Sequence, residues 1–202
     1  AYGADCFVGY TVSYWAAPYA ERIFAVDKAS LGLLIGAPAA LGGFLGVVFG
    51  GRLADMLEAR FPAGRIMVLA IALIMPVPIM LVGYSTGSPA LFYVLAFAVQ
   101  FVTASALGAA AAASQSLVLP RMRGTATGIF FLGTTLCGLG LGPFMAGFVS
   151  EATGNLAHGV KSTLVAAPFG LIALAIAIRT APRAAATLVE RARAAGETIA
   201  AA

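Results

Sequence analysis

The chain has 202 residues, of which 61% are hydrophobic and only 10% are charged, with a formal net charge of +4. So large an apolar fraction exceeds what a globule of this size can bury, which excludes a soluble domain and predicts an integral membrane protein. The charge is spread over loops and one tail, which excludes a nucleic-acid partner, and two distant cysteines exclude a secreted disulfide scaffold.

Six apolar segments are long enough to cross a bilayer, because about 20 helical residues span about 30 Å of hydrocarbon. The chain begins without methionine and without signal-peptide features, so we expect it to be cut within the first span, which ends near Tyr19. The turn-forming residues 83–89 divide the uncharged stretch between residues 66 and 120 into two spans. The expected fold is therefore all-α, with later spans at residues 29–51, 66–82, 90–119, 124–150 and 162–178.

Basic residues predict the orientation of these spans. The side with few of them carries only Arg22, Lys28 and Lys161. Because basic residues favour the cytoplasmic side, the other side and the C-terminus are expected to be cytoplasmic, in a bacterial inner membrane. We expect a six-helix bundle over residues 1–180 and a cytoplasmic tail over residues 181–202. This tail is expected to be solvated and partly frayed, and the alternative is a short helix lying on the membrane. The cytoplasmic basic residues are Arg52, Arg60, Arg65, Arg121, Arg123, Arg179, Arg183, Arg191 and Arg193.

Glycines recur at helical spacing in the second and fifth spans. Small residues four apart let helix backbones approach closely in a membrane, so both spans are expected to pack tightly against partners. Prolines inside several spans predict kinked helices, because each removes a backbone hydrogen bond. The glycines of the second span are Gly32, Gly36, Gly42, Gly46 and Gly50, and those of the fifth are Gly124, Gly128, Gly133, Gly138, Gly142 and Gly147.

Residues 50–60, after the second span, read Gly-Gly-Arg-Leu-Ala-Asp-Met-Leu-Glu-Ala-Arg. This segment resembles the cytoplasmic loop signature of the major facilitator superfamily, in which a glycine precedes Leu-Ala-Asp-Arg, a second glycine and two basic residues. Met56 replaces the family's arginine, Glu58 its second glycine and Ala59 its first basic residue, so the segment looks like the second-half copy of the motif. The matching residues are Gly51, Leu53, Ala54, Asp55 and Arg60.

A second resemblance covers residues 120–126, 138–143 and Gly147, which are similar to the tenth-to-eleventh helix region of that superfamily, and especially of its spinster-like (lysolipid and sphingolipid transporter) branch. Residues 14–22 likewise resemble its seventh helix and outer loop. The resemblance implies the C-terminal six-helix half of a twelve-helix transporter, whose partner is a missing N-terminal half. Two inverted three-helix repeats would build this half, and glycine-dense helix ends on opposite sides fit such a repeat.

The loop after the second span is expected to gate the cytoplasmic side. Gly51 would permit close helix approach, and Asp55 would accept hydrogen bonds from the start of a neighbouring helix. Arg60 and Arg65 would pair with Asp55 or with lipid headgroups. The alternative is an ordinary charged loop. The expected gating residues are Gly51, Asp55, Arg60, Arg65, Arg121 and Arg123.

Asp5 is the charged residue expected inside the bilayer, about 15 Å below an interfacial Trp15 at 1.5 Å of rise per residue. A carboxyl group there predicts a substrate or proton site, with Gly9 and Ser13 on the same helix face. The alternative places Asp5 in the cytoplasmic interface, with the helix starting later. The expected cavity and coupling residues are Asp5, Tyr10, Tyr14, Gln100, Thr103 and Thr134.

The polar residues of the fourth and fifth spans allow two interpretations. Gln100 and Thr103 share a face near mid-membrane and suit hydrogen bonding to a ligand. They suit interhelical hydrogen bonds equally well, at about 0.6 kcal/mol on average. Thr134 lies mid-span, where a hydroxyl commonly bonds its own helix.

The sequence predicts secondary transport of an organic or amphiphilic solute by alternating access, with proton coupling through Asp5 as one option. No cofactor or metal is expected, because the single histidine, His158, lies in an external loop and no phosphate-binding loop of the Walker type is present. An enzyme is not expected. The open alternatives are a complete six-span protein acting as a homodimeric half-transporter or membrane-embedded enzyme, and a sensor that binds without transporting.

Overall fold

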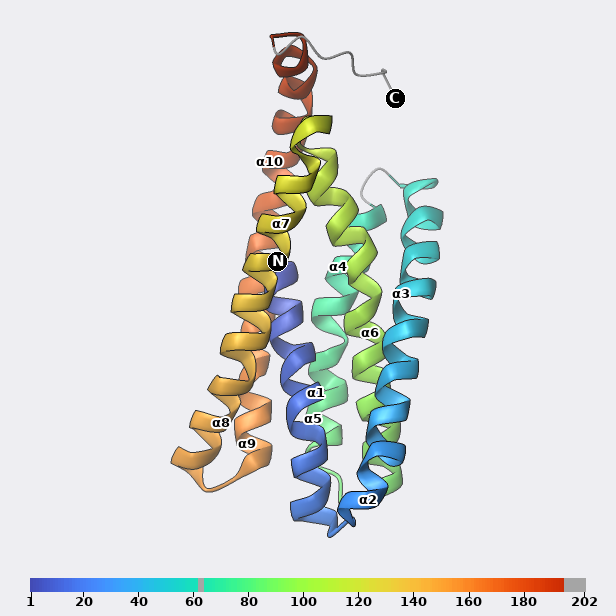
Figure 1. The fold of residues 1–202 in the computed structure, drawn as a ribbon, viewed down its shortest axis with the longest axis vertical. Coiled ribbons are helices and arrows are strands. Elements are labelled where there is room, and N and C mark those ends of the chain that lie inside the picture. Colours follow the sequence, from blue (N-terminus) through green and yellow to red (C-terminus); the bar gives the residue numbers. More distant parts are fainter. Residues whose placement is uncertain (62–63, 195–202) are drawn as a thin grey trace.

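The computed structural model describes residues 1–61 and 64–194, which are helical throughout apart from short connections (Figure 1). Two helices are interrupted by π-helical turns, η1 (Gly32–Gly36) and η3 (Thr135–Gly140), and two short 3-10 turns are η2 (Pro120–Met122) and η4 (Thr163–Val165). The α-helices are α1 (Tyr2–Phe24), α2 (Lys28–Leu31), α3 (Ala37–Glu58), α4 (Gly64–Ile74), α5 (Pro76–Gly83), α6 (Pro89–Ser116), α7 (Arg123–Thr134), α8 (Leu141–Thr153), α9 (Leu156–Ser162) and α10 (Ala166–Ala194).

Five continuous helical stretches of the described chain are long and apolar enough to cross a membrane. They match the second to sixth expected spans and confirm an all-helical membrane fold. The first helix, α1, has 23 residues but is not one of the five, and it carries Asp5, Glu21 and Arg22. The five stretches are Lys28–Glu58, Gly64–Gly83, Pro89–Ser116, Pro120–Thr153 and Leu156–Thr180.

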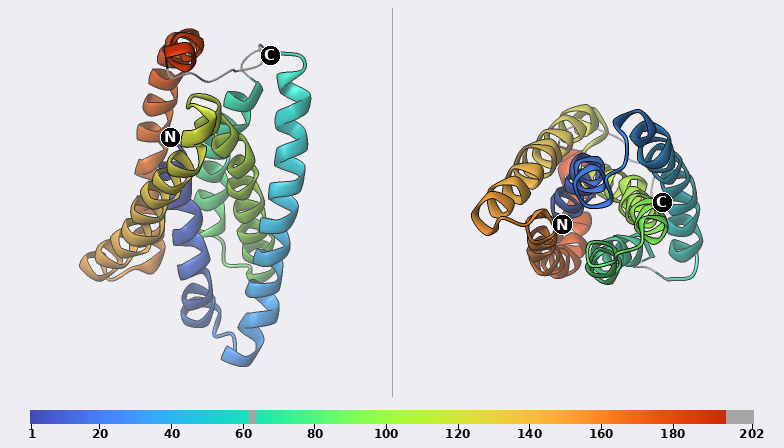
Figure 2. Two further views of the ribbon diagram at one scale, coloured as in Figure 1. Left: turned by 45° about the horizontal axis from the view of Figure 1, so that its top comes forward. Right: turned by 90° about the horizontal axis from the view of Figure 1, so that it is seen from below.

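Helix α1 lies in the interior of the bundle, in contact with α6 on one side and with η3, α8 and α10 on the other (Figures 1 and 2). Its side chains Val8, Val12 and Ala16 are buried in the main hydrophobic cluster. Near its C-terminal end, Tyr19 packs against Phe92, with ring centroids 5.0 Å apart. These contacts bury Asp5 and Thr11 of α1, and a buried acidic residue inside a membrane bundle is typical of an internal site.

The glycines of α3 form a close seam with α6, as expected. A Cβ atom on Gly42 would lie 3.0 Å from the carbonyl oxygen of Phe97, and one on Gly46 would overlap the carbonyl oxygen of Phe101. Gly50 likewise leaves no room beside Ser105. Backbone packs on backbone here, which is how small residues join helices in membranes.

The fifth span follows the same rule only in part. Gly138 and Gly142 lie against α1, where a Cβ atom would crowd Cys6 and Thr11 respectively. Gly147 also lies against α1, where a Cβ atom would be 3.0 Å from the Trp15 ring, whereas five other glycines expected to pack, in the second and fifth spans, face open space in this structure. These are Gly32, Gly36, Gly124, Gly128 and Gly133.

The external loop expected at residues 151–161 is much shorter in the structure. Gly154, with φ of 66°, ends α8 in a left-handed conformation that glycine adopts without strain. Asn155 then caps α9, because its side-chain oxygen accepts a hydrogen bond from the backbone nitrogen of Ala157 at 2.9 Å. His158 therefore lies in the first turn of α9 and is exposed.

The last helix continues beyond its expected end near residue 178. Helix α10 runs from Ala166 to Ala194, so the first part of the expected tail is helical rather than frayed. Residues 195–202 lie outside the described part of the chain.

Candidate functional site

A polar hollow of about 190 Å³ lies between α1 and α6. It brings together Asp5 and Tyr10 from α1 with Gln100 and Thr103 from α6, four of the six residues expected to line a cavity. Tyr2, Cys6, Gly9, Ala104 and Leu107 complete the lining. The spacing of Asp5 and Gly9 by one helical turn places both on the face that α1 turns toward α6.

Asp5 is the buried acidic residue of this hollow. Its exposure is 2%, and its Oδ1 atom has no hydrogen-bond partner among the described residues. An ionised carboxylate taken out of water without a partner costs several kcal/mol. A proton or a cation must therefore accompany this group for the site to be stable.

Thr103 is held against α1 by a close approach. Its hydroxyl donates to the carbonyl oxygen of Val99 at 2.9 Å, one turn earlier in its own helix. A Cβ atom on Gly9 would lie 3.1 Å from that hydroxyl oxygen. Gly9 thus lets α1 and α6 meet beside the hollow, and Thr103 bonds its own helix while lining the hollow.

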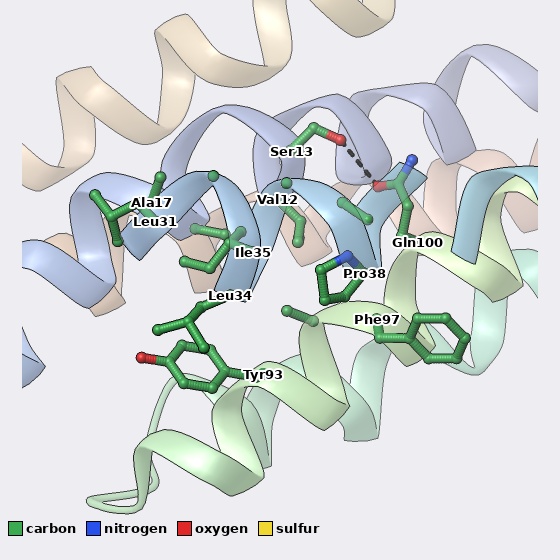
Figure 3. A pocket seen from close by; sticks show the side chains of 15 residues that line it. Val12, Ser13, Ala17, Leu31, Leu34, Ile35, Pro38, Tyr93, Phe97 and Gln100 are labelled. Atoms are coloured by element: carbon green, nitrogen blue, oxygen red, sulfur yellow. Dashed lines mark hydrogen bonds between the residues drawn. The ribbon is translucent and has the colours of Figure 1, made fainter. Parts of the chain in front are cut away.

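Gln100 links α1 and α6 through its side chain. The hydroxyl of Ser13 donates to Gln100 Oε1 at 2.9 Å, a hydrogen bond drawn in Figure 3. Acceptance of this bond leaves the amide NH₂ group of Gln100 free to donate. Gln100 therefore joins the two helices and still offers a donor to the hollow.

A second hollow of about 210 Å³ begins at Gln100 and extends along η1 (Figure 3). Its walls are mainly apolar, with Ile35 and Pro38 facing Tyr93 and Phe97 across the space. The sequence interpretation missed this hollow. The sequence feature that could have pointed to it is the pair of glycines at the two ends of η1. π-helical turns frequently occur at functional sites.

Two of the six expected cavity residues lie elsewhere. Tyr14 is 60% exposed and packs edge-on against Trp15, with ring centroids 5.3 Å apart. Thr134 is buried, and its hydroxyl donates to the carbonyl oxygen of Phe131 at 3.1 Å in its own helix. Neither lines the hollow around Asp5.

Trp15 makes a contact that the sequence interpretation did not foresee. Its indole nitrogen donates to the carbonyl oxygen of Pro143 at 2.9 Å, which joins α1 to α8. An aromatic residue at this depth was expected to anchor at the membrane interface. Gly147 makes room for the indole ring, because a Cβ atom there would lie 3.0 Å from it.

The loop after α3 pairs its charges differently from expectation. Arg65 forms an ion pair with Glu58 at 2.7 Å rather than with Asp55. The Asp55 side chain has no hydrogen bond or ion pair with any described residue, and Arg60 is exposed. Arg65 thus uses the acidic residue that stands where the superfamily motif has glycine.

The structure also corrects the close helix approach expected at Gly51. A Cβ atom on Gly51 would meet nothing within 4 Å, whereas the preceding Gly50 is the residue buried against α6. The exposed Arg121 lies in η2 and the exposed Arg123 is the first residue of α7, which begins at the same end of the bundle as the end of α3 (Figure 1). Nearby, Gln115 donates to Thr127 at 3.1 Å and so ties α6 to α7.

The described residues, 1–61 and 64–194, do not form a cluster of metal-binding side chains. No three His, Cys, Asp or Glu side chains gather there in an arrangement that holds a metal ion. The chemistry of the hollow is that of one carboxyl group, one amide, hydroxyls and two tyrosine rings.

Comparison with known sequences identifies the family. The sequence model of the Major Facilitator Superfamily matches residues 1–201. The chain belongs to the Major Facilitator Superfamily. This confirms the expected resemblance to the superfamily, and membership points to a membrane transporter rather than an enzyme.

Related proteins agree with this assignment. An MFS-type efflux pump of Mycolicibacterium smegmatis is 27% identical over 147 residues, which cover 71% of this chain and 33% of the pump. The fold is similar to two structures of a bacterial homologue of the human lysosomal transporter Spinster, both inward-facing. The occupied form has a TM-score of 0.68, the unoccupied form 0.64, and both are 23% identical.

The chain spans only part of these relatives. It covers 47% of each solved chain, while 91% and 94% of its own residues are matched. Nearly all of this chain therefore corresponds to about half of a superfamily transporter.

Proposed function

We propose that this chain is the C-terminal six-helix half of a twelve-helix secondary transporter, which moves an organic or amphiphilic solute by alternating access. The length relation to the solved relatives supports this, as does the hollow on the face between α1 and α6. Helix α1 would be the first of six crossings. Two inverted three-helix repeats would make up the bundle of residues 1–180, and the missing N-terminal half would provide the facing wall of the solute site.

The same proposal includes an orientation. The bundle lies in a bacterial inner membrane with its C-terminus in the cytoplasm, followed by a cytoplasmic tail over residues 181–202. The distribution of arginines supports this, since basic residues favour the cytoplasmic side. The loop with Asp55, Arg60 and Arg65, together with Arg121 and Arg123, would then form the cytoplasmic gate.

The observation that carries the proposal is the enclosed carboxyl group of Asp5. A buried acid without a partner is expensive, and inside a membrane bundle such residues mark substrate or proton pathways. We propose that Asp5 takes up a proton when the hollow opens to one side and releases it when the hollow opens to the other. Binding of the proton would thereby bias the equilibrium between the two states.

Removal of this carboxyl group tests the proposal. The full-length protein would be reconstituted in liposomes with an imposed pH gradient, and uptake measured for three radiolabelled probes: benzyltrimethylammonium, benzenesulfonate and lysophosphatidylcholine. We expect gradient-driven uptake of at least one probe, and at least about a tenfold loss of that uptake in Asp5→Asn, equivalent to about 1.4 kcal/mol.

Asp27→Asn is the matched control. Asp27 is exposed beyond the end of α1 and caps α2 by accepting a hydrogen bond from the Ala29 nitrogen at 3.1 Å. Asparagine caps a helix equally well, so this variant should transport like the unmodified protein. Uptake that stayed fully responsive to pH in Asp5→Asn would contradict the coupling role, and absence of uptake for all three probes would count against transport itself.

A further inference from the structure

The hollow around Asp5 is lined by one acidic side chain and, among the described residues, by no basic one. Among the described residues, no lysine or arginine side chain lines it, and the Oδ1 atom of Asp5 lacks a partner. The other polar side chains of the lining are Gln100 and Thr103 from α6, and Tyr2, Cys6 and Tyr10 from α1. A lone buried carboxylate attracts positive charge and repels negative charge strongly, because the surroundings screen little.

Aromatic rings stand beside this carboxyl group. Tyr2 and Tyr10 line the same hollow from α1, two turns apart. The Tyr2 ring is held by stacking on Phe130, with centroids 5.3 Å apart and planes inclined by 12°. Tyr10 is 40% exposed. Ring faces attract cations, and substituted ammonium groups are recognised in this way.

The volume of the hollow limits the size of the group that it can bind. Sites for drug-sized ligands enclose about 300–1,000 Å³, whereas this hollow measures about 190 Å³. The part of the site that this chain encloses therefore suits a charged group, and under the proposed function the N-terminal half would enclose the rest of the solute. The apolar hollow of about 210 Å³, which shares Gln100 as a wall, continues the space for an uncharged body.

We infer that Asp5, with the rings of Tyr2 and Tyr10, binds the ammonium group of an organic cation, and that this cation and a proton compete for the same carboxylate. The inference rests on the proposed transport function and names the class of solute. One carboxylate then serves both coupling and recognition, because it cannot hold both positive charges at once.

The groups that face Asp5 permit this competition. The titratable side chains around it on α1 are Tyr2, Cys6 and Tyr10, and η3 brings Cys137 close to Gly3. Helix α6 contributes only neutral polar groups to the hollow. From α4 and α10, the side chains packed on this part of α1 are apolar, with Leu73 and Leu174 at the centre. None of these groups is a cation that would neutralise Asp5 permanently.

Equilibrium binding to the full-length protein tests the inference. Radiolabelled benzyltrimethylammonium would be compared with benzenesulfonate, an aromatic probe of opposite charge, over a series of pH values. We expect saturable binding of the cation alone, with affinity that falls as the pH is lowered. Asp5→Asn should weaken cation binding by at least about tenfold and abolish its pH dependence, whereas Asp5→Glu should stay within about threefold.

Variants at Tyr10 keep the test decisive if changes at Asp5 impair folding. Tyr10→Leu removes the ring and should weaken cation binding by about threefold to tenfold, whereas Tyr10→Phe keeps the ring and should bind as the unmodified protein does. Equal binding of both probes, or unchanged cation affinity in Asp5→Asn, would overturn the inference. If only benzenesulfonate or lysophosphatidylcholine showed Asp5-dependent uptake, the transport proposal would stand and the cation inference would fall. If the cation bound but no probe was taken up, the cation inference would stand and the transport proposal would fall.

Discussion

Helix α6 packs against α3 on one side and against α1 on the other, and these two contacts are built differently. Toward α3, Gly42, Gly46 and Gly50 bring the two backbones together without space between them. Toward α1, the helices meet at Gly9 and Thr103 and leave a polar hollow beside Asp5. A regular row of glycines makes a continuous seam, whereas a single glycine among larger polar residues makes one point of contact next to a cavity.

The seam should be the more sensitive of the two contacts. In Gly46→Leu the side chain would overlap the Phe101 carbonyl group, a backbone atom that cannot move aside alone. We expect a loss of about 3 kcal/mol in folding free energy, measured as a large fall in Tm of the full-length protein in detergent. Gly51→Leu is the control, because open space surrounds Gly51, and it should change stability by less than about 0.5 kcal/mol. Equal effects of the two substitutions would contradict the close seam.

The contact between Gly9 and Thr103 should tolerate a larger side chain better than the seam between α3 and α6 does. In Gly9→Ala the added methyl group would lie 3.1 Å from the Thr103 hydroxyl oxygen, a side-chain atom that yields more easily than backbone. We expect a loss of about 1 kcal/mol. Thr103→Ala in the same protein should restore part of it, and a double-mutant cycle of Tm values would measure the coupling. Strictly additive effects would mean that Gly9 and Thr103 do not meet.

The hydrogen bond between Ser13 of α1 and Gln100 of α6 should contribute least. Ser13→Ala removes the bond from Ser13 to Gln100 and should cost about 0.6 kcal/mol, the average for interhelical hydrogen bonds in membranes. Ser116→Ala serves for comparison, since Ser116 is exposed and donates to Ala113 in its own helix. Its Tm should match that of the unmodified protein. A loss at Ser13 as large as that at Gly46 would show that the hollow, rather than the seam, holds α6 in place.

Local features of the sequence predicted much of this. The apolar lengths placed five spans with bounds that differ from the observed ones by one to seven residues, and the four-residue glycine spacing predicted the seam on α3. Asp5, Tyr10, Gln100 and Thr103 were chosen from their types and helix faces, and the structure brings them to one hollow. Whether they act in transport stays a prediction.

Other features depended on helix rotation and on neighbours. Gly50 rather than Gly51 faces α6, and one residue along a helix turns the side chain by about 100°, so the motif could not decide between them. Arg65 reaches Glu58 instead of Asp55 because α4 begins beside the end of α3 at Gly64, close to Leu57 and Glu58. Tyr14 and Thr134 likewise lie away from the hollow because of how their helices are rotated.

Hydropathy, helix length and motif spacing are local properties of the chain, so they were sufficient to predict a helical membrane protein of a transporter family. The burial of Asp5, the position of Gln100 between two hollows and the hydrogen bond of Trp15 to α8 became visible in the folded chain alone. These depend on how far each helix is rotated and which helix stands beside it. Many weak packing contacts set that arrangement together, and no single segment encodes it.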